Sequence, residues 1–406
     1  MAAKIVVPTI ALVLLAGCSE QSHGPHVRSG DPDVEVQSPT ALSNDQLRQL
    51  AQQISAAAQN KDPAALAAVF DWDGLLYTAA SDLQAPKAEH IRFAAEMKGN
   101  DKKLGVLGQK IVEWVKEGAQ YKFLRAHVED GQQRLLFRLA VPDAVDFNYH
   151  DVVLSRRPDG KVRASDVYIF NTGEMLSQTT RRAFIMSTLR LAEASTAKLK
   201  GIEPEFQQHF KKIELMNDFI RVGQYKDVLR LYDQLPLRLQ RDKNVMLTRL
   251  VAAQAVGGDA NKAAIDDFRN FFPDDPCIER FAIVYCVEKR DFPAALSKVD
   301  VIEKAIGGDP YLDVIRATLQ LEADNPAAAR KLAEKAVAAE PTLRDAYMTL
   351  VFVSLKEGNH AETLDRLKDA YRRFAPALGD LTKQPKFAEF VKSPQYQEWL
   401  KWRSTP

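Results

Sequence analysis

The sequence predicts an α+β protein in which a domain of helices and strands precedes a long all-α array. Two observations carry this prediction. After Gly118 the spacing of apolar residues changes from about 3.6, typical of helices, to 2, typical of strands. Between residues 204 and 375, short phrases containing Gly, Asp or Asn recur about every 32 to 35 residues and interrupt helical stretches.

Composition excludes several classes of protein. The 406 residues are 46% hydrophobic and 27% charged, which is typical of a globular protein. Lys and Arg number 55 against 54 Asp and Glu, so the net charge is +1 and the basic excess of a nucleic-acid binder is missing. No phosphate loop, dinucleotide fingerprint, His-Glu-x-x-His, Cys-x-x-Cys or Gly-x-Ser-x-Gly motif occurs, and the seven histidines are scattered. We therefore predict no enzyme activity, cofactor or metal.

The N-terminus has the pattern of an export signal. Lys4 precedes an apolar run from Ile5 to Leu15, which is shorter than the roughly 20 residues of a membrane-spanning helix. Leu15-Ala16-Gly17-Cys18 resembles the bacterial lipobox. The resemblance implies cleavage of 1–17 between Gly17 and Cys18 and acylation of Cys18 on sulfur and amine, giving a stable membrane anchor. The alternative is an ordinary secretory signal with an incidental cysteine.

The residue after Cys18 is Ser19 rather than Asp. In enterobacterial lipoproteins, which this N-terminus resembles, that favours sorting to the outer membrane. Residues 18–40 are rich in Ser, Gly, Pro, Asp and Gln without an apolar period, so we expect a flexible tether. The expected location is therefore the bacterial cell envelope, at the outer membrane and facing the periplasm.

Helices are expected first in the folded part. Asn44 as N-cap begins a helix over 44–59, and Pro63 at the first helical position begins a second helix that ends at Phe70. A third helical pattern covers 87–118 with an interruption at 99–100. Four strands follow, at 121–128, 134–141, 147–156 and 161–170, joined by short turns at 129–132 and 158–160. They predict an antiparallel meander with helices on one face.

Three helices followed by four strands, with the phrases Asn60–Leu66 and Val167–Glu174, resemble the nuclear transport factor 2-like cone family. The resemblance covers most of the stretch 41–175 and depends on topology and pattern. It implies a cone that holds a ligand or, as in ketosteroid isomerase and scytalone dehydratase relatives, performs acid–base chemistry. Polar candidates for such a pocket are Asp73, Tyr77, His127, Tyr149, Asp151, Asp166 and Tyr168.

Asp166 and Tyr168 are the pocket pair of greatest interest. By the period of two they share one face of the last strand with Phe170, while Val167 and Ile169 share the other, and either face fits the core. A buried Asp beside a Tyr has a raised pKa and suits a general base. The competing interpretation is that Tyr168 packs in the core and that Asp166 is solvated or satisfied by a backbone amide.

The repeated phrases are centred on Gln224, Asp259, Asp291, Asn325 and Asn359. Helical pairs of about 34 residues with small residues near the turn resemble the tetratricopeptide repeat. The best unit spans Pro310–Pro341, where Ala317, Ala329, Ala336 and Pro341 match the small and proline positions of that family. Thr363 replaces the alanine represented by Ala329, and the units before 276 are degenerate.

The repeat resemblance implies about five units stacked in a solenoid, because one helical pair cannot cover its apolar face alone. It also implies a groove lined by first helices. Val314, Tyr347, Met348 and Phe352 are the candidate groove residues, with core between repeats as the alternative. Cys277 and Cys286 are nine residues apart on one expected helix, which points them apart, so we predict unpaired, buried thiols.

The predicted domains follow the chain in order. They are the signal peptide 1–17, the tether 18–40, the cone-like domain 41–175, a connecting helix in 176–203, the repeats 204–375 and capping helices in 376–406. The predicted function is that of a lipid-anchored scaffold or binding protein that recognises a protein or peptide in the repeat groove. The alternative is a small-molecule binder, or a lyase or isomerase, that uses the cone pocket.

Overall fold

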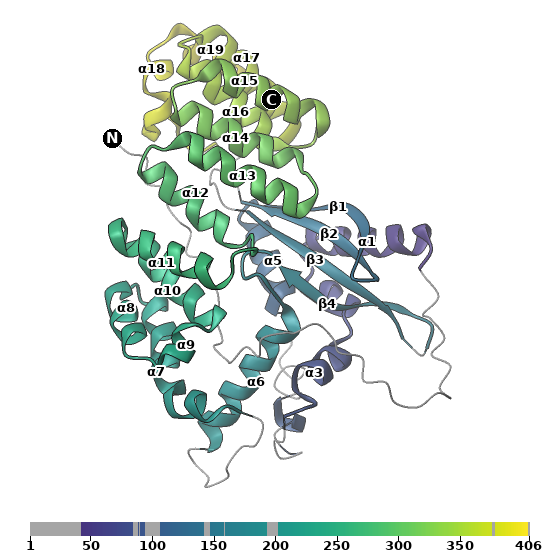
Figure 1. The fold of residues 1–406 in the computed structure, drawn as a ribbon. Helices are drawn as coiled ribbons and strands as arrows, with labels where there is room; N and C mark the ends of the chain where they lie inside the picture. The colour runs from purple at the N-terminus through teal and green to yellow at the C-terminus, as the bar shows by residue number, and fades with distance from the viewer. Residues whose placement is uncertain are drawn as a thin grey trace. The chain divides into compact units, whose positions relative to one another are not determined.

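A computed structural model describes residues 42–83, 88, 90–93, 106–141, 147–157, 159–192, 202–375 and 378–404 (Figure 1). The expected signal peptide, Gly17, Cys18 and the tether lie outside these described residues. By internal contacts the chain divides into two compact units, one up to Ile278 and one from Glu279 onward.

The first unit begins with helices whose ends follow from local capping. They are α1 (Asn44–Gln59), α2 (Pro63–Val69), α3 (Trp72–Ala80) and α5 (Val106–Lys116). The predicted N-cap Asn44 is wrong, because Ser43 caps α1: its hydroxyl accepts from the Gln46 amide, and the Gln46 side chain accepts from the Ser43 amide. This reciprocal capping box satisfies two amide donors at once. Helix α3 has no counterpart among the predicted elements.

In the described part of the chain, five strands form one antiparallel sheet in sequential order, with β5 as the strand that sequence reasoning missed. They are β1 (Gln120–Glu129), β2 (Gln132–Ala140), β3 (Phe147–Arg156), β4 (Val162–Ile169) and β5 (Glu174–Met175). Asp130 and Gly131 have φ of 51° and 72°. Such values at both central residues produce the tight hairpin turn between β1 and β2. The α+β class is thus observed.

One face of the sheet forms a core with α1, α2 and α5. Its side chains come from alternate positions of the strands, and helices contribute residues at helical spacing. The cluster includes Leu135, Phe137, Val152 and Val167 from the strands and Leu47, Leu50, Ile54, Ile111 and Val112 from the helices. Because Val167 is fully buried here, the Val167 and Ile169 face of β4 is the one that meets these helices.

A second core joins α6 (Leu176–Ala192) to the helices that follow it. Phe184, Ile185 and Leu189 of α6 pack in one cluster with Phe206 and Phe210. The following helices are α7 (Pro204–Arg221), α8 (Tyr225–Asp233), α9 (Leu237–Gln240), α10 (Lys243–Val256) and α11 (Gly258–Phe271). This shared core explains why the first compact unit extends to Ile278 rather than ending near the boundary expected at 176–203.

Within residues 202–375, which are all described, five helix pairs follow one another. Those of the second unit are α12 with α13 (Phe292–Ile306), α14 (Pro310–Glu322) with α15 (Pro326–Ala339), and α16 (Arg344–Lys356) with α17 (His360–Phe374); α12 (Ile278–Glu288) begins at the division. The N-caps of the second helices stand at nearly even intervals along the chain, at Gln224, Gly257, Asp291, Asn325 and Asn359. The phrases centred on Gln224, Asp291, Asn325 and Asn359 therefore lie at turns between two helices, whereas Asp259 lies in the first turn of α11, two residues beyond the N-cap.

Four of the five turns share one backbone feature. The residue before the N-cap is left-handed at Gly223, Arg290, Asp324 and Gly358, with φ between 56° and 74°. Asp291, Asn325 and Asn359 then accept a hydrogen bond from the amide three residues later. Glycine adopts positive φ without penalty, whereas Arg290 does so at a cost of about 1–2 kcal/mol.

In the second unit, α14 packs against α13, α15 and α16, and α15 against α16. Small side chains at Ala317, Ala329 and Ala333 meet Leu350 and Val353 in one buried cluster. Ion pairs connect the same helices: Arg316 of α14 pairs with Asp300 and Glu303 of α13, and Arg330 of α15 pairs with Glu357 and Glu362. Consecutive pairs of this unit are thus held by both apolar and charged contacts.

The C-terminal segment covers α16 and α17 within the second unit. It forms η1 (Leu381–Lys383), η2 (Pro385–Phe387), α18 (Ala388–Val391) and α19 (Pro394–Arg403). Phe387, Phe390 and Trp399 are fully buried in a cluster with Tyr347 and Leu367. The aromatic residues of the tail therefore bury the apolar side of the final helix pair.

Gly173 ties the end of the sheet to α10 inside the first unit. The Lys243 ammonium, at the first position of α10, donates to the Gly173 carbonyl and pairs with Asp275. Asp275 also accepts from the Cys277 amide. A Cβ at Gly173 would lie 2.5 Å from Lys243 Nζ and 2.8 Å from the Asp275 carboxylate. Only glycine fits both this space and the φ of 60°.

We predict that Gly173→Ala destabilises the protein more than Gly131→Ala. Both residues have positive φ, but no atom lies within 4 Å of a Cβ at Gly131. Each variant loses about 1 kcal/mol from backbone strain, and Gly173→Ala loses about 1–2 kcal/mol more because it displaces a partly buried ion pair. Urea denaturation measures the difference; equal losses in the two variants would contradict the packing described here.

Candidate functional site

The face of the sheet opposite the α1 core carries charged side chains. The ladder places His127 of β1 opposite Arg134 of β2, and Leu136 of β2 opposite Asp151 of β3. A bulge in β1 between Phe123 and Arg125 shifts its later side chains so that His127 and Glu129 come to this face. The fold thus brings together side chains from three strands, which spacing along the sequence does not reveal.

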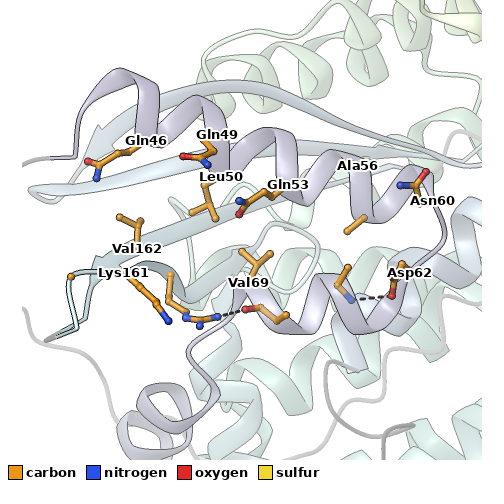
Figure 2. A pocket seen from close by; sticks show the side chains of 15 residues that line it. Gln46, Gln49, Leu50, Gln53, Ala56, Asn60, Asp62, Val69, Lys161 and Val162 are labelled. Atoms are coloured by element: carbon orange, nitrogen blue, oxygen red, sulfur yellow. Dashed lines mark hydrogen bonds between the residues drawn. The ribbon is translucent and has the colours of Figure 1, made fainter.

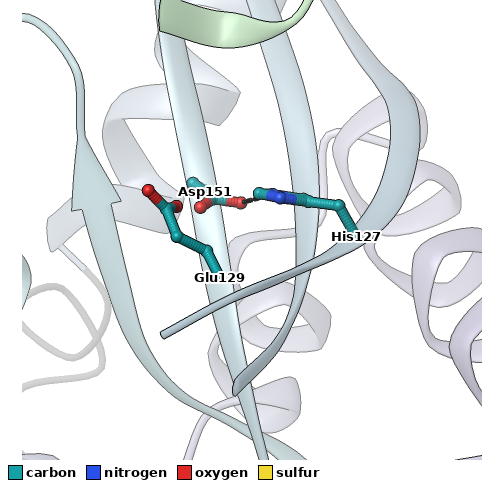
Figure 3. A group of neighbouring side chains, drawn as sticks. All are labelled: His127, Glu129 and Asp151. Atoms are coloured by element: carbon teal, nitrogen blue, oxygen red, sulfur yellow. Dashed lines mark hydrogen bonds and ion pairs between the residues drawn. The ribbon is translucent and has the colours of Figure 1, made fainter. Parts of the chain in front are cut away.

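His127, Glu129 and Asp151 lie close together (Figure 3), and Arg134 joins them in an ion-pair network. His127 Nε2 lies 2.8 Å from Asp151 Oδ1, and Arg134 Nη1 lies 3.2 Å from Asp151 Oδ2 and 3.0 Å from Glu129 Oε2. The Arg134 and Asp151 side chains are 9% and 8% exposed, whereas that of His127 is 31% exposed. A buried cation and anion thus anchor a histidine that solvent reaches.

The same network is the group among the described residues that comes closest to a metal site. One ligand atom from each of His127, Glu129 and Asp151 lies within 4.8 Å of the others. The guanidinium of Arg134, however, already binds both carboxylates. A metal cation at this position would meet its positive charge at close range, so the donor set fits an ion-pair network better than a metal site.

Asp166 holds the start of α6. Its Oδ1 accepts hydrogen bonds from the backbone amides of Val167, at 2.8 Å, and Ser177, at 3.0 Å. Burial raises the pKa of the Asp166 carboxyl above its ordinary value, although these hydrogen bonds oppose the shift. The raised pKa agrees with the general-base hypothesis, but the two amide contacts fit the competing interpretation, in which backbone satisfies the carboxylate.

Tyr168 lies beside the charged network, directly opposite Asp151 in the β3–β4 ladder. Burial raises the pKa of its hydroxyl, and the Asp275, Cys277 and Glu129 side chains add to the effect. The structure therefore brings Tyr168, Asp151 and His127 of the predicted candidates to one face. Tyr149 shares this face by its alternation with Asp151 but packs against Phe147 and Phe170, and Asp73 and Tyr77 lie on α3.

Sequence reasoning missed a buried polar chain on the α1 side of the sheet. His150 Nδ1 lies 3.3 Å from the Tyr121 hydroxyl, and its Nε2 lies 3.1 Å from Asn148 Nδ2. The Asn148 side chain accepts from the Asn171 amide. Complete burial lowers the pKa of His150 to about 4, so this histidine is neutral at pH 7. In the sequence, His150 stands two residues before the apolar Val152, and this spacing of two is the signal that could have predicted its burial.

Two cavities of the first unit are described, and neither is lined by Asp166 or Tyr168. One of 740 Å³ lies between α1, α2 and the β3–β4 hairpin (Figure 2). The other, of 220 Å³, is lined by Asp73, Tyr77, His90 and neighbouring residues. The predicted pocket pair therefore does not border either space.

The predicted groove residues are covered by their own unit. Val314, Tyr347 and Met348 are buried, between 4% and 7% exposed. The half-buried Phe352 contacts Phe387 and lies 4.6 Å below the Lys386 ammonium. This burial agrees with the alternative interpretation, in which these side chains form core between helices.

Cys277 and Cys286 are both buried and neither forms a disulfide, as predicted. Among the described residues, no helix combines the length and apolar character needed to cross a bilayer. Comparisons with protein-family models, curated proteins and solved structures found no match. Function must therefore be inferred from the residues and geometry of this chain.

We expect Asp166→Ala to cost about 1–3 kcal/mol of unfolding free energy, because two buried amides lose their acceptor. Asp166→Asn keeps one acceptor oxygen and serves as the matched variant.

Since the native state holds the Asp166 proton more tightly than the unfolded chain does, wild-type stability falls as pH rises above 3.8, the ordinary pKa of an aspartate. The unfolding free energy of Asp166→Asn relative to that of wild type should therefore increase from pH 4 to pH 7, as measured by urea denaturation. An unchanged difference would refute the raised pKa.

Proposed function

We propose that this protein is a lipid-anchored scaffold or binding protein of the bacterial cell envelope that recognises a protein or peptide through its helix pairs. The carrying observation is the succession of five helix pairs whose second helices begin at nearly even intervals along the chain. Structures of this kind bind partners along extended surfaces because each repeat exposes an equivalent face.

The repeat interpretation is supported by the packing of the second unit. Small residues at Ala317 and Ala329 allow close helix contact, as they do in the tetratricopeptide family that the sequence resembles. In the first unit, the sheet covered on one face by helices is compatible with the cone family. We propose both family assignments, together with a solenoid order of the pairs, on this basis.

The recognition surface that we propose lies on second helices. First helices α14 and α16 are buried around most of their circumference, with buried residues on every side. Helix α15 instead buries one stripe, Ala329, Ala333 and Ala336, and exposes Lys331 and Glu334. A partner therefore reaches α13, α15 and α17 without unfolding the array.

The alternative function, a small-molecule binder, lyase or isomerase, has less support. Its proposed base, Asp166, is engaged by two backbone amides, and neither described cavity reaches it. The scaffold hypothesis needs no such pocket.

The anchor hypothesis predicts that metabolic labelling with an alkyne fatty acid marks the full chain in a bacterial host and that Cys18→Ala abolishes the label. The physical reason is that several acyl chains on one residue give stable attachment, whereas one chain binds marginally. Ser19→Ala serves as the control and keeps the label. Equal labelling of Cys18→Ala would refute an anchor at this residue.

For the partner surface, we predict that a photo-crosslinking residue at Lys331 captures a defined partner in envelope fractions. The same residue at the exposed Lys116 of α5 captures none, because that helix is outside the helix pairs. Both variants are made in the full chain, and mass spectrometry identifies the products. The same partner at both positions, or none at either, contradicts recognition through the second helices.

A further inference from the structure

The first unit contains a groove of 740 Å³ between two helices and a hairpin. Helix α1 forms one wall, α2 forms the other, and Gly160 to Arg163 of the β3–β4 hairpin close one end (Figure 2). Gln46, Gln49 and Gln53 follow one another along α1 at helical spacing and border the space. Leu50, Ala57 and Val69 supply apolar surface between the walls.

The amide row suits a ligand with alternating donors and acceptors. The side chains of Gln49 and Gln53 each offer two N–H donors and a carbonyl acceptor, which match the C=O and N–H groups of a peptide backbone, whereas Gln46 offers its N–H donors because its Oε1 already accepts from Ser43 and Arg156. Gln49 and Gln53 are exposed, so their side chains are accessible to a ligand. The described residues that line the groove include no aromatic side chain. A sugar chain, which stacks on aromatic rings, is therefore a poorer match than a peptide.

Positive charge gathers at the hairpin end of the groove. Arg156 is not a lining residue, but it donates to the carbonyl of Gly160 and to Oε1 of Gln46, which both line the groove; the lining residue Arg163 donates to the Ala68 carbonyl. These acceptors are neutral, and no carboxylate among the described residues lies within ion-pairing distance of either guanidinium. Lys161 is 69% exposed, and its ion-pair contact with Asp159 is 3.9 Å long. The charges are therefore available to an anionic ligand.

The one carboxylate that lines the groove among the described residues lies at the other end. Asp62 caps α2, where its Oδ1 accepts from the amides of Ala64 and Ala65, and Figure 2 places it far from Lys161. Its negative charge is therefore directed at the start of a helix, where it is favourable. The two ends of the groove thus differ in charge.

The strand at the hairpin end also offers backbone groups. Beyond Tyr168 and Ile169, which pair with β5, the outer edge of β4 meets only a bridge between Phe70 and Ala164 in the described residues. Across that edge the Ala164 carbonyl accepts from the Asp71 amide. Val162 lies two residues earlier, so its backbone N–H and C=O point to the same side by the period of the strand. Val162 is one of the residues that line the groove.

We propose that this groove binds an extended peptide segment carrying acidic side chains. The peptide hydrogen-bonds to the edge of β4 at Val162 and to the glutamine row of α1, and its carboxylates lie against Arg156, Lys161 and Arg163. Edge pairing supplies backbone contacts, and the charges select acidic sequences. The site belongs to the sheet of the first unit, so it is independent of the function proposed for the helix pairs.

Fluorescence anisotropy with the full chain tests the proposal. The probe is a labelled synthetic peptide of alternating glutamate and valine, compared with its lysine–valine counterpart, with a backbone N-methylated version and with an acidic oligogalacturonate. We expect saturable binding of the first probe alone, weakened by added salt because the contacted charges are exposed. Absence of binding by the glutamate–valine peptide overturns the proposal, and binding of the oligogalacturonate in its place assigns the groove to a glycan.

Variants separate the parts of the site. Lys161→Gln and Arg156→Gln should each weaken binding roughly three- to tenfold, as expected for loss of one exposed charge contact. Arg48→Gln removes an equal charge from α1 at a residue that pairs with Asp45, outside the groove lining, and should leave affinity unchanged. Gln53→Trp, placed at an exposed helix position, should block the groove while circular dichroism stays native. Equal affinity in wild type and Gln53→Trp, or equal binding of the N-methylated peptide, overturns binding at this edge.

Discussion

The packing of α6 is the contact on which the first unit depends. Asp166 fixes its first turn beside β4, and Phe184 and Leu189 then enter a core that also contains Phe206 and Phe210. Helix α6 contacts β4 and β5 and also lies in the core of the first helix pairs, so it connects the sheet to those helices. A chain that shares a core in this way unfolds as a unit, so a change at the sheet is felt in the helices that follow.

Both faces of the sheet carry buried polar side chains, which are neutral on one face and charged on the other. On the α1 side, His150 is neutral, fully buried and paired with Tyr121 and Asn148. On the other side, charge is retained, because Arg134 and Asp151 neutralise each other. Buried polar groups are tolerated only when partnered. Both arrangements obey that requirement, and only the second leaves a side chain, His127, open to solvent.

Periodicity was enough to predict four strands, the helix α1 and four of the five turns within helix pairs, because each depends on residues close in sequence. Sequence reasoning failed where contacts between side chains or between distant residues determine the structure. The N-cap of α1 is Ser43 rather than Asn44 because the Ser43 and Gln46 side chains each accept from the other residue's backbone amide. Strand β5 forms because its two residues pair with β4. The charged network and the groove need a bulge in β1 and the meeting of α1 with a hairpin far along the chain, which no local pattern contains. Burial of Val314 and Met348 likewise depends on neighbours that spacing does not specify.

In the second unit the first helices are more buried than the second helices, so substitutions are tolerated less well on the first helices than on the second. On α16 nearly every position touches core, so almost any replacement alters a packed volume. On α15 the outward positions contact solvent and tolerate replacement at little cost in stability. Over evolutionary time, descendants of this chain can therefore change the exposed faces of α13, α15 and α17 while the architecture beneath stays the same.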